Sequence, residues 1–98
     1  MITLDEMKEW LRVFHDEEDA LVNSLILTSI SIIKSATGIT KDYIQSCNHE
    51  NIQDLYKMVQ RVLITDLYNE RDTENKALTS YYIQLELEYK EVLSYENR

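Results

Sequence analysis

The 98-residue chain contains no proline, and Gly38 is its only glycine. These two residue types end helices and form the turns of β-structure, so their scarcity favours helices over any all-β architecture. Hydrophobic residues make up 44% and charged residues 29% of the chain, which is typical of a folded protein rather than a disordered one. A chain of this length closes one modest core. We therefore expect an all-α fold, a small bundle of about four helices in a single domain that spans residues 1–98.

A capping box predicts the start of the first helix. Thr3 and Glu6 are three positions apart, so each side chain can accept a hydrogen bond from the backbone N–H of the other. The predicted helix covers residues 4–13, with Trp10 on its apolar side.

The second predicted helix begins after Asp16, which can act as its N-cap, and ends at Gly38. Leu27 and Ile30 lie outside its apolar face, and Lys34 is the only charged residue on the side opposite that face. A helix side that faces water normally carries more charge than this. The predicted apolar face consists of Leu21, Val22, Leu25, Ile26, Ile32, Ile33 and Ala36.

The second half of the chain is predicted to contain a loop with a short turn at residues 39–51, a helix at 52–71 and a break at 72–76. The pattern at residues 79–93 is ambiguous, because apolar residues alternate as in a strand and also recur with helical spacing. Glu, Leu and Lys dominate this segment and it has no hairpin partner, so we expect a helix.

The formal net charge of −8 argues against gripping nucleic acid, because phosphate contacts require clustered Lys and Arg, and the chain has no basic cluster. The single Cys47 cannot form an internal disulfide, and the first residues do not form a secretory signal. Residues 20–33 are expected to be too short and too polar to span a bilayer. We therefore expect a soluble intracellular chain with no membrane partner.

No motif in the sequence indicates catalysis or a cofactor. Residues 16–19 are all acidic, but ligands at adjacent helical positions point in different directions, so capping is the favoured interpretation. Cys47 and His49, with His15 elsewhere, do not form a zinc or nucleophile pattern. We expect no catalytic, cofactor-binding or metal-binding residue, and a small enzyme is the weakest functional alternative.

Five segments taken in order resemble the phage head-to-tail connector (adaptor) family, whose members are also called DNA-packaging proteins. Their order and spacing carry the resemblance, which covers nearly the whole chain. The segments are ITLDEMKEWLRV at 2–13, DEEDAL at 16–21, ATG at 36–38, LYNER at 67–71 and IQL at 83–85.

The resemblance implies a structural virion protein that catalyses no reaction. It implies a homo-oligomeric ring of about a dozen copies that docks on the portal, extends the DNA channel and offers a platform to the next connector or tail protein. Assembly would take place in the host cytoplasm, from a phage or prophage genome. An acidic channel wall would let DNA pass without specific binding, which is compatible with the net charge of −8.

The predicted subunit contacts lie in two places. The sparsely charged side of the second helix is what a helix covered by a neighbouring subunit would show. The end of the third predicted helix carries the LYNER segment. The candidate residues are Asn23, Leu27, Ile30 and Lys34 on the second predicted helix, and Asp66, Tyr68 and Arg71 at the end of the third.

Asp66 falls on an apolar helix face, where a carboxylate costs several kcal/mol unless it is paired. A partner within the core, such as Arg12, Arg61 or a tyrosine hydroxyl, is the favoured prediction, and a partner on another subunit is the alternative. Seven tyrosines, including Tyr81 and Tyr82, either mark a binding face or fill the core.

A different class of function also fits the charge. An acidic module that mimics DNA could inhibit a basic, nucleic-acid-binding host protein. This alternative explains the net charge but not the order of the connector-like segments. Binding to a basic partner that is lost at moderate salt would favour it.

Overall fold

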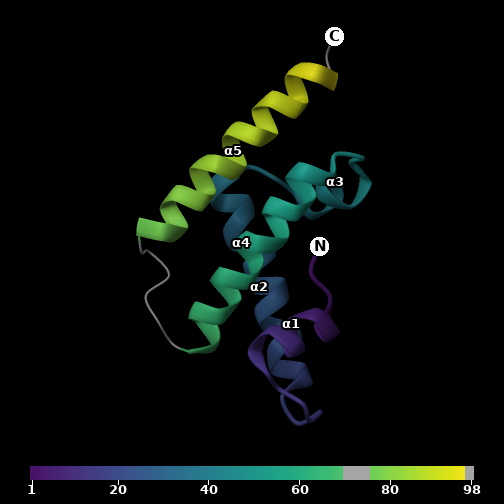
Figure 1. Cartoon of the computed structure of the whole chain (residues 1–98), viewed down its shortest axis with the longest axis vertical. Helices are drawn as coiled ribbons and strands as arrows, with labels where there is room; N and C mark the ends of the chain where they lie inside the picture. Colours follow the sequence, from purple (N-terminus) through teal and green to yellow (C-terminus); the bar gives the residue numbers. More distant parts are fainter. Residues whose placement is uncertain (70–75, 97–98) are drawn as a thin grey trace.

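The structure is a computed structural model that describes residues 1–69 and 76–96, and all secondary structure in these residues is helical (Figure 1). The expected all-α fold is confirmed, and a short fifth helix is added to the expected set. The helices are α1 (Leu4–Leu11), α2 (Asp19–Thr37), α3 (Lys41–Ser46), α4 (Glu50–Tyr68) and α5 (Lys76–Glu96).

The predicted capping box at the start of α1 is confirmed. The Thr3 hydroxyl accepts from the Glu6 backbone N–H at 3.2 Å, and the Glu6 carboxylate accepts from the Thr3 backbone N–H at 3.2 Å. The helix ends two residues earlier than predicted because Arg12 adopts a left-handed conformation with φ 59°. Its N–H bonds to the carbonyl of Glu9, which satisfies the end of the helix without a glycine.

The prediction that Asp16 caps the second helix is wrong. Helix α2 begins at Asp19, and Glu18 at the cap position makes no side-chain cap bond. The Asp16 carboxylate instead pairs with Lys8 at 3.0 Å, and Lys8 also pairs with Asp19 at 2.7 Å. The Lys8 ammonium of α1 therefore links this helix to the turn before α2 and to the first residue of α2. The predicted end at Gly38 is confirmed, with φ 81°.

Helix α3 lies inside the segment predicted to be a loop. Thr40 caps it by accepting from the Tyr43 backbone N–H at 3.1 Å, and its buried residue is Ile44. Together with buried Ile39 just before it, Ile44 anchors this short helix to the core, which explains how six residues remain helical.

The core consists of two clusters that meet along α4. The smaller cluster lies between α1, α2 and α4, and the larger cluster joins α2, α3, α4 and α5. The molecule measures 48 × 27 × 17 Å along its principal axes. The smaller cluster consists of Ile2, Met7, Val22, Ile26 and Ile64. The larger cluster consists of Ile33, Ile39, Ile44, Cys47, Ile52, Tyr56, Val59, Leu63, Leu78, Leu85 and Val92.

Helix α5 confirms the helical interpretation of the ambiguous C-terminal pattern. Leu78, Leu85 and Val92 recur every seven residues and are buried in the larger cluster, while Tyr82 and Tyr89 pack partly buried beside them. In Figure 1 this helix crosses the molecule diagonally in front of α2.

Candidate subunit interface

Helix α2 presents a polar, nearly uncharged outer side. Asn23, Leu27 and Lys34 are exposed there, and Leu27 is 61% exposed. Ile30, which was predicted to lie outside the apolar face, is half buried and packs against the smaller cluster. Three of the four predicted contact residues on this helix therefore share one accessible side, and the fourth lies at its edge.

The buried side of α2 includes Val22, Ile26 and Ile33 of the predicted apolar face, but two polar residues also belong to it. The Ser29 hydroxyl donates to the Ile26 carbonyl at 2.6 Å, and the Thr37 hydroxyl donates to the Ile33 carbonyl at 2.8 Å. Hydroxyls satisfied by their own helix can be buried at little cost. The buried residues are Val22, Ile26, Ser29, Ile33 and Thr37, whereas Leu21 and Ala36, predicted to be in the core, are exposed.

Helix α2 is the one helix in the described residues long and apolar enough to cross a membrane. Its 19 residues correct the expectation that this stretch is too short. Length and composition are weak evidence, since the core helix of a folded bundle passes the same test. Helix α2 packs against α1, α4 and α5, and its Ser29 accepts a hydrogen bond from Gln60 of α4 at 3.1 Å.

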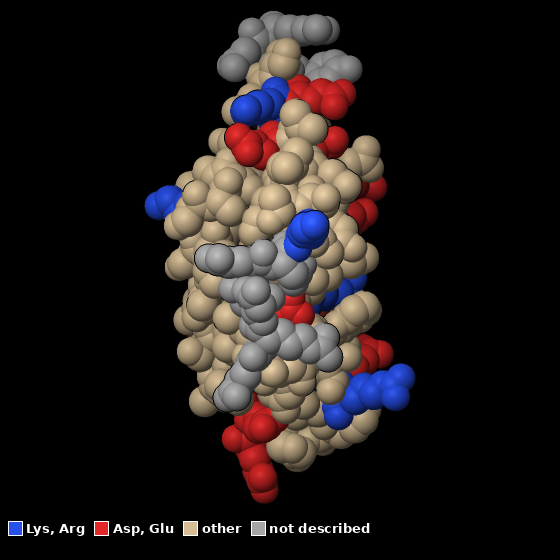
Figure 2. All heavy atoms as spheres, turned by 90° about the vertical axis from the view of Figure 1, so that its left-hand side faces the viewer, with Lys and Arg blue, Asp and Glu red and all other residues tan. Residues whose placement is uncertain are grey.

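Figure 2 shows the side of the molecule on which α5 begins. Most of the visible surface is uncharged, and the acidic side chains gather toward the two ends and along one edge.

The end of α4 carries the second predicted contact region. Asp66 is 7% exposed, as predicted from its position on the apolar face. Burial raises the pKa of the Tyr82 hydroxyl, and the charge of Asp66 raises it further. Tyr68 is half buried and its hydroxyl donates to the Glu18 carboxylate at 2.5 Å, which raises the pKa of Tyr68. Arg71 lies outside the described residues. Tyr68 therefore joins the end of α4 to the start of α2.

Three tyrosines of α5 belong to the core. Tyr81, Tyr82 and Tyr89 all pack partly buried against the larger cluster. The Tyr89 ring meets the Tyr43 ring edge-on, with centroids 4.8 Å apart. The sequence left open whether the tyrosines mark a binding face or fill the core, and these three fill the core.

Trp10, which was predicted to lie on the apolar side of the first helix, is 51% exposed, so the prediction that it packs in the core is wrong. Its indole N–H donates to the Thr65 hydroxyl at 3.1 Å, and the Arg61 guanidinium lies 5.4 Å from the ring centroid. A shallow hollow of about 560 Å³ beside it is lined by Glu6, Glu9, Trp10, Arg12 and Arg61.

Sequence reasoning missed the exposure of six large apolar side chains, namely Trp10, Phe14, Leu21, Met58, Ile83 and Leu87. The signal for the last two was available. They are four residues apart, on the side of α5 opposite its buried leucines, a pattern that only becomes visible once the segment is known to be helical.

The described residues contain no group of three or more His, Cys, Asp or Glu side chains that could hold a metal ion. Cys47 is buried, and its thiol contacts the Ile44 carbonyl at 3.6 Å. The acidic run at residues 16–19 uses two of its carboxylates to bind Lys8.

The family described as Phage gp6-like head-tail connector protein matches residues 1–97 of the chain. No curated protein and no solved structure matches this chain.

Proposed function

Because the chain belongs to the phage gp6-like head-tail connector family, we propose that copies of it form a ring beneath the portal. Membership makes it a structural virion component that interacts with other phage head and tail proteins. The ring of about a dozen copies would extend the DNA channel, complete the head and receive the next connector or the tail.

One observation carries the assembly step. Helix α2 exposes Leu27 on a side whose only charged residue is Lys34, in a chain with a net charge of −8. Contact with a neighbouring copy would cover this side and remove apolar area from water. We propose that Asn23, Leu27 and Lys34 make this contact, with Ile30 at its edge.

We assign a second contact to the end of α4. Asp66, Tyr68 and Arg71 would meet another subunit or the portal there, and the bond from Tyr68 to Glu18 makes Tyr68 a residue that positions this end against α2.

The charge supports a channel role rather than DNA binding. Duplex DNA is repelled by a wall that carries excess carboxylates, so it slides without sticking. The net charge of −8 per copy would be multiplied around a ring.

Electron microscopy and light scattering test this proposal, with the protein alone and mixed with the portal protein of the same phage. We expect rings, or added density on the distal end of the portal. A stable monomer that leaves the portal unchanged would overturn the proposal. Salt-sensitive binding of that monomer to a basic host protein would then support the DNA-mimic alternative.

The Leu27→Glu variant tests the α2 contact. Leu27 is 61% exposed, so the monomer should keep its helicity and its melting temperature, while the charge blocks assembly. Rings at normal yield would show that this side of α2 is not the interface.

A further inference from the structure

The outer side of α5 carries a second apolar patch, which stays exposed among the residues that the structure describes. Ile83 is 54% and Leu87 61% exposed. Leu87 lies two residues after buried Leu85, or about 200° around the helix, so it points away from the core. Ile83 lies one turn before Leu87 on the same side. We call these two residues the α5 patch.

The α5 patch and the outer side of α2 point in different directions. Helices α2 and α5 contact each other, and each turns its buried side chains toward the shared core. Their exposed sides therefore face away from the core on different parts of the surface. A head-to-tail contact, which repeats from one copy to the next until a ring closes, requires two different patches of this kind on one chain.

The charges of the two surfaces are complementary. Lys34 is the only charged residue on the outer side of α2. In α5, the Glu86 and Lys90 side chains pair with each other at 3.3 Å, and Glu91 is exposed one turn beyond Leu87. The outer side of α2 thus carries a single positive charge, and the α5 surface carries Glu91 beside the Glu86–Lys90 pair, whose two charges offset each other.

We propose that the α5 patch of one copy packs against the outer side of α2 of the next copy. This inference rests on the proposed ring function and names the partner surface of the α2 contact. The occupant of both patches is then a second copy of this chain, and every copy in the ring uses both.

The spacing of the residues fixes a direction for the two helices. Leu27 to Lys34 spans about 10.5 Å and Ile83 to Glu91 about 12 Å, at 1.5 Å per residue. With α2 and α5 of neighbouring copies parallel and Leu27 against Ile83, Lys34 therefore lies beside Glu91. An antiparallel arrangement with the same apolar contact separates these two charges.

Disulfide trapping tests the head-to-tail contact in the full chain, assembled alone or on the portal. In a Cys47→Ser background, the combination of Leu27→Cys with Ile83→Cys should give a ladder of covalently linked subunits after oxidation. Each single cysteine variant should give no linked dimer. Dimers from Leu27→Cys alone would mean that α2 meets α2, and this result would overturn the inference.

Assembly of surface variants gives a second readout. Leu87→Glu should lower the ring yield at least about tenfold, as is also expected for Leu27→Glu, which corresponds to a loss of roughly 1.4 kcal/mol per contact. Lys34→Glu should lower it at low salt, and Glu91→Lys in the same chain should restore it, since the pair is then reversed at every contact. Met58→Glu, at an exposed apolar residue of α4, is the matched control.

The two failures are distinguishable. If the wild-type protein forms no ring with or without the portal, the proposed function fails and the inference fails with it. If wild-type rings form but the double cysteine variant gives no ladder and Leu87→Glu assembles normally, the function survives and the α5 contact is wrong.

Discussion

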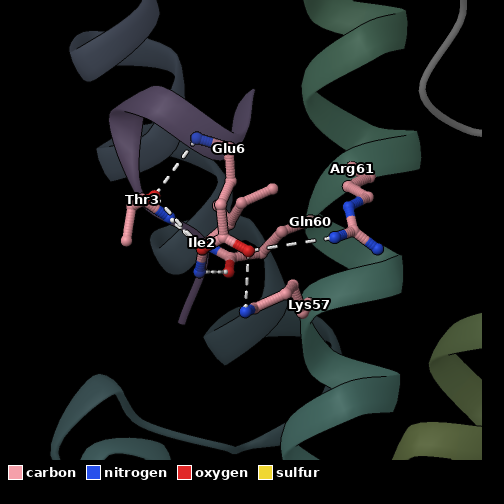
Figure 3. Close-up of polar contacts among 6 residues, drawn as sticks. All are labelled: Ile2, Thr3, Glu6, Lys57, Gln60 and Arg61. Carbon is pink, nitrogen blue, oxygen red and sulfur yellow. Dashed lines mark hydrogen bonds and ion pairs between the residues drawn. The ribbon is translucent and has the colours of Figure 1, made fainter. Parts of the chain in front are cut away.

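The two core clusters are built in different ways. In the smaller cluster, polar groups are matched to partners. Gln60 is fully buried on α4, where it accepts from the Ile2 backbone N–H at 2.9 Å and donates to the Ser29 hydroxyl at 3.1 Å (Figure 3 shows the bond to Ile2). In the larger cluster, the Tyr56 hydroxyl is fully enclosed and makes no hydrogen bond with the described residues.

This difference indicates that hydrogen bonds fix the arrangement of the helices in the smaller cluster, whereas buried apolar area stabilises the larger one. The smaller cluster has few apolar residues, and its hydrogen bonds hold the first residues of the chain, α2 and α4 in one arrangement. The larger cluster depends on the amount of apolar surface that it removes from water. We therefore expect mutations in the larger cluster to act through volume, and mutations in the smaller cluster to act through unmatched polar groups.

The largest effect should come from Leu85→Ala in the larger cluster. Leu85 is fully buried at the centre of α5, so its truncation should lower the free energy of unfolding by about 2–5 kcal/mol. Leu87→Ala is the same change two residues away at an exposed site, and it should cost less than about 0.5 kcal/mol. Urea unfolding measures both, and equal losses would contradict the packing of α5 described above.

The stability of the protein at alkaline pH should depend on Tyr56, whose hydroxyl has no hydrogen-bond partner among the described residues. Burial raises the pKa of Tyr56 from 10.0 to about 12, so the folded state favours the neutral phenol. Its contribution to stability is complete below pH 10 and is lost as the pH rises from 10 toward 12, a loss of about 2 kcal/mol. The free energy of unfolding of the Tyr56→Phe variant, measured across this pH range, should not show that part of the decline. A variant that declines as steeply as the wild type would refute the assignment.

The corresponding test in the smaller cluster is Gln60→Leu. The leucine keeps the volume but leaves the Ile2 backbone N–H buried without its acceptor, which should cost about 1–2 kcal/mol. Gln45→Leu, at an exposed position of α3, should be nearly neutral. Thermal unfolding compares the two. If Gln60→Leu stabilises the protein, apolar area rather than hydrogen bonding would govern this cluster as well.

The sequence predicted those features that depend on neighbouring residues. The capping box at Thr3, the helix end at Gly38 and the helical spacing of the apolar residues at 79–93 are decided within a few positions along the chain. Asp16 failed as a cap because its carboxylate binds Lys8, eight residues earlier, which no local rule includes.

The candidate interface was predicted in part for the same reason. Helical spacing was enough to place Leu27 on the outer side of α2. It could not place Ser29 in the core, because that depends on its bonds to Ile26 and to Gln60. The α5 patch could have been predicted from the helix expected at residues 79–93, in which Ile83 and Leu87 lie opposite Leu85, whereas in a strand Ile83 and Leu85 would have shared one face.

The smallest effect should come from the ion pair at the edge of the smaller cluster. Figure 3 shows the Glu6 carboxylate between Thr3 and Lys57, and the Lys57 ammonium lies 2.9 Å from it. This bond is the main reason why the pKa of Glu6 lies below its ordinary value of 4.5. Both side chains are partly exposed, so Lys57→Met should cost only about 0.2–1 kcal/mol at neutral pH.

The pH and salt dependence would distinguish this ion pair from simple packing. A lowered pKa in the folded state gives stability that is present above pH 4.5 and is lost as the pH falls through the lowered value, so the two proteins should converge in acid. The difference should also shrink at high salt. Lys90→Met, which breaks a more exposed pair with Glu86, should cost less still. A Lys57→Met loss that is independent of both pH and salt would instead assign the role of Lys57 to its aliphatic stem, and the smaller cluster would then depend on area as the larger one does.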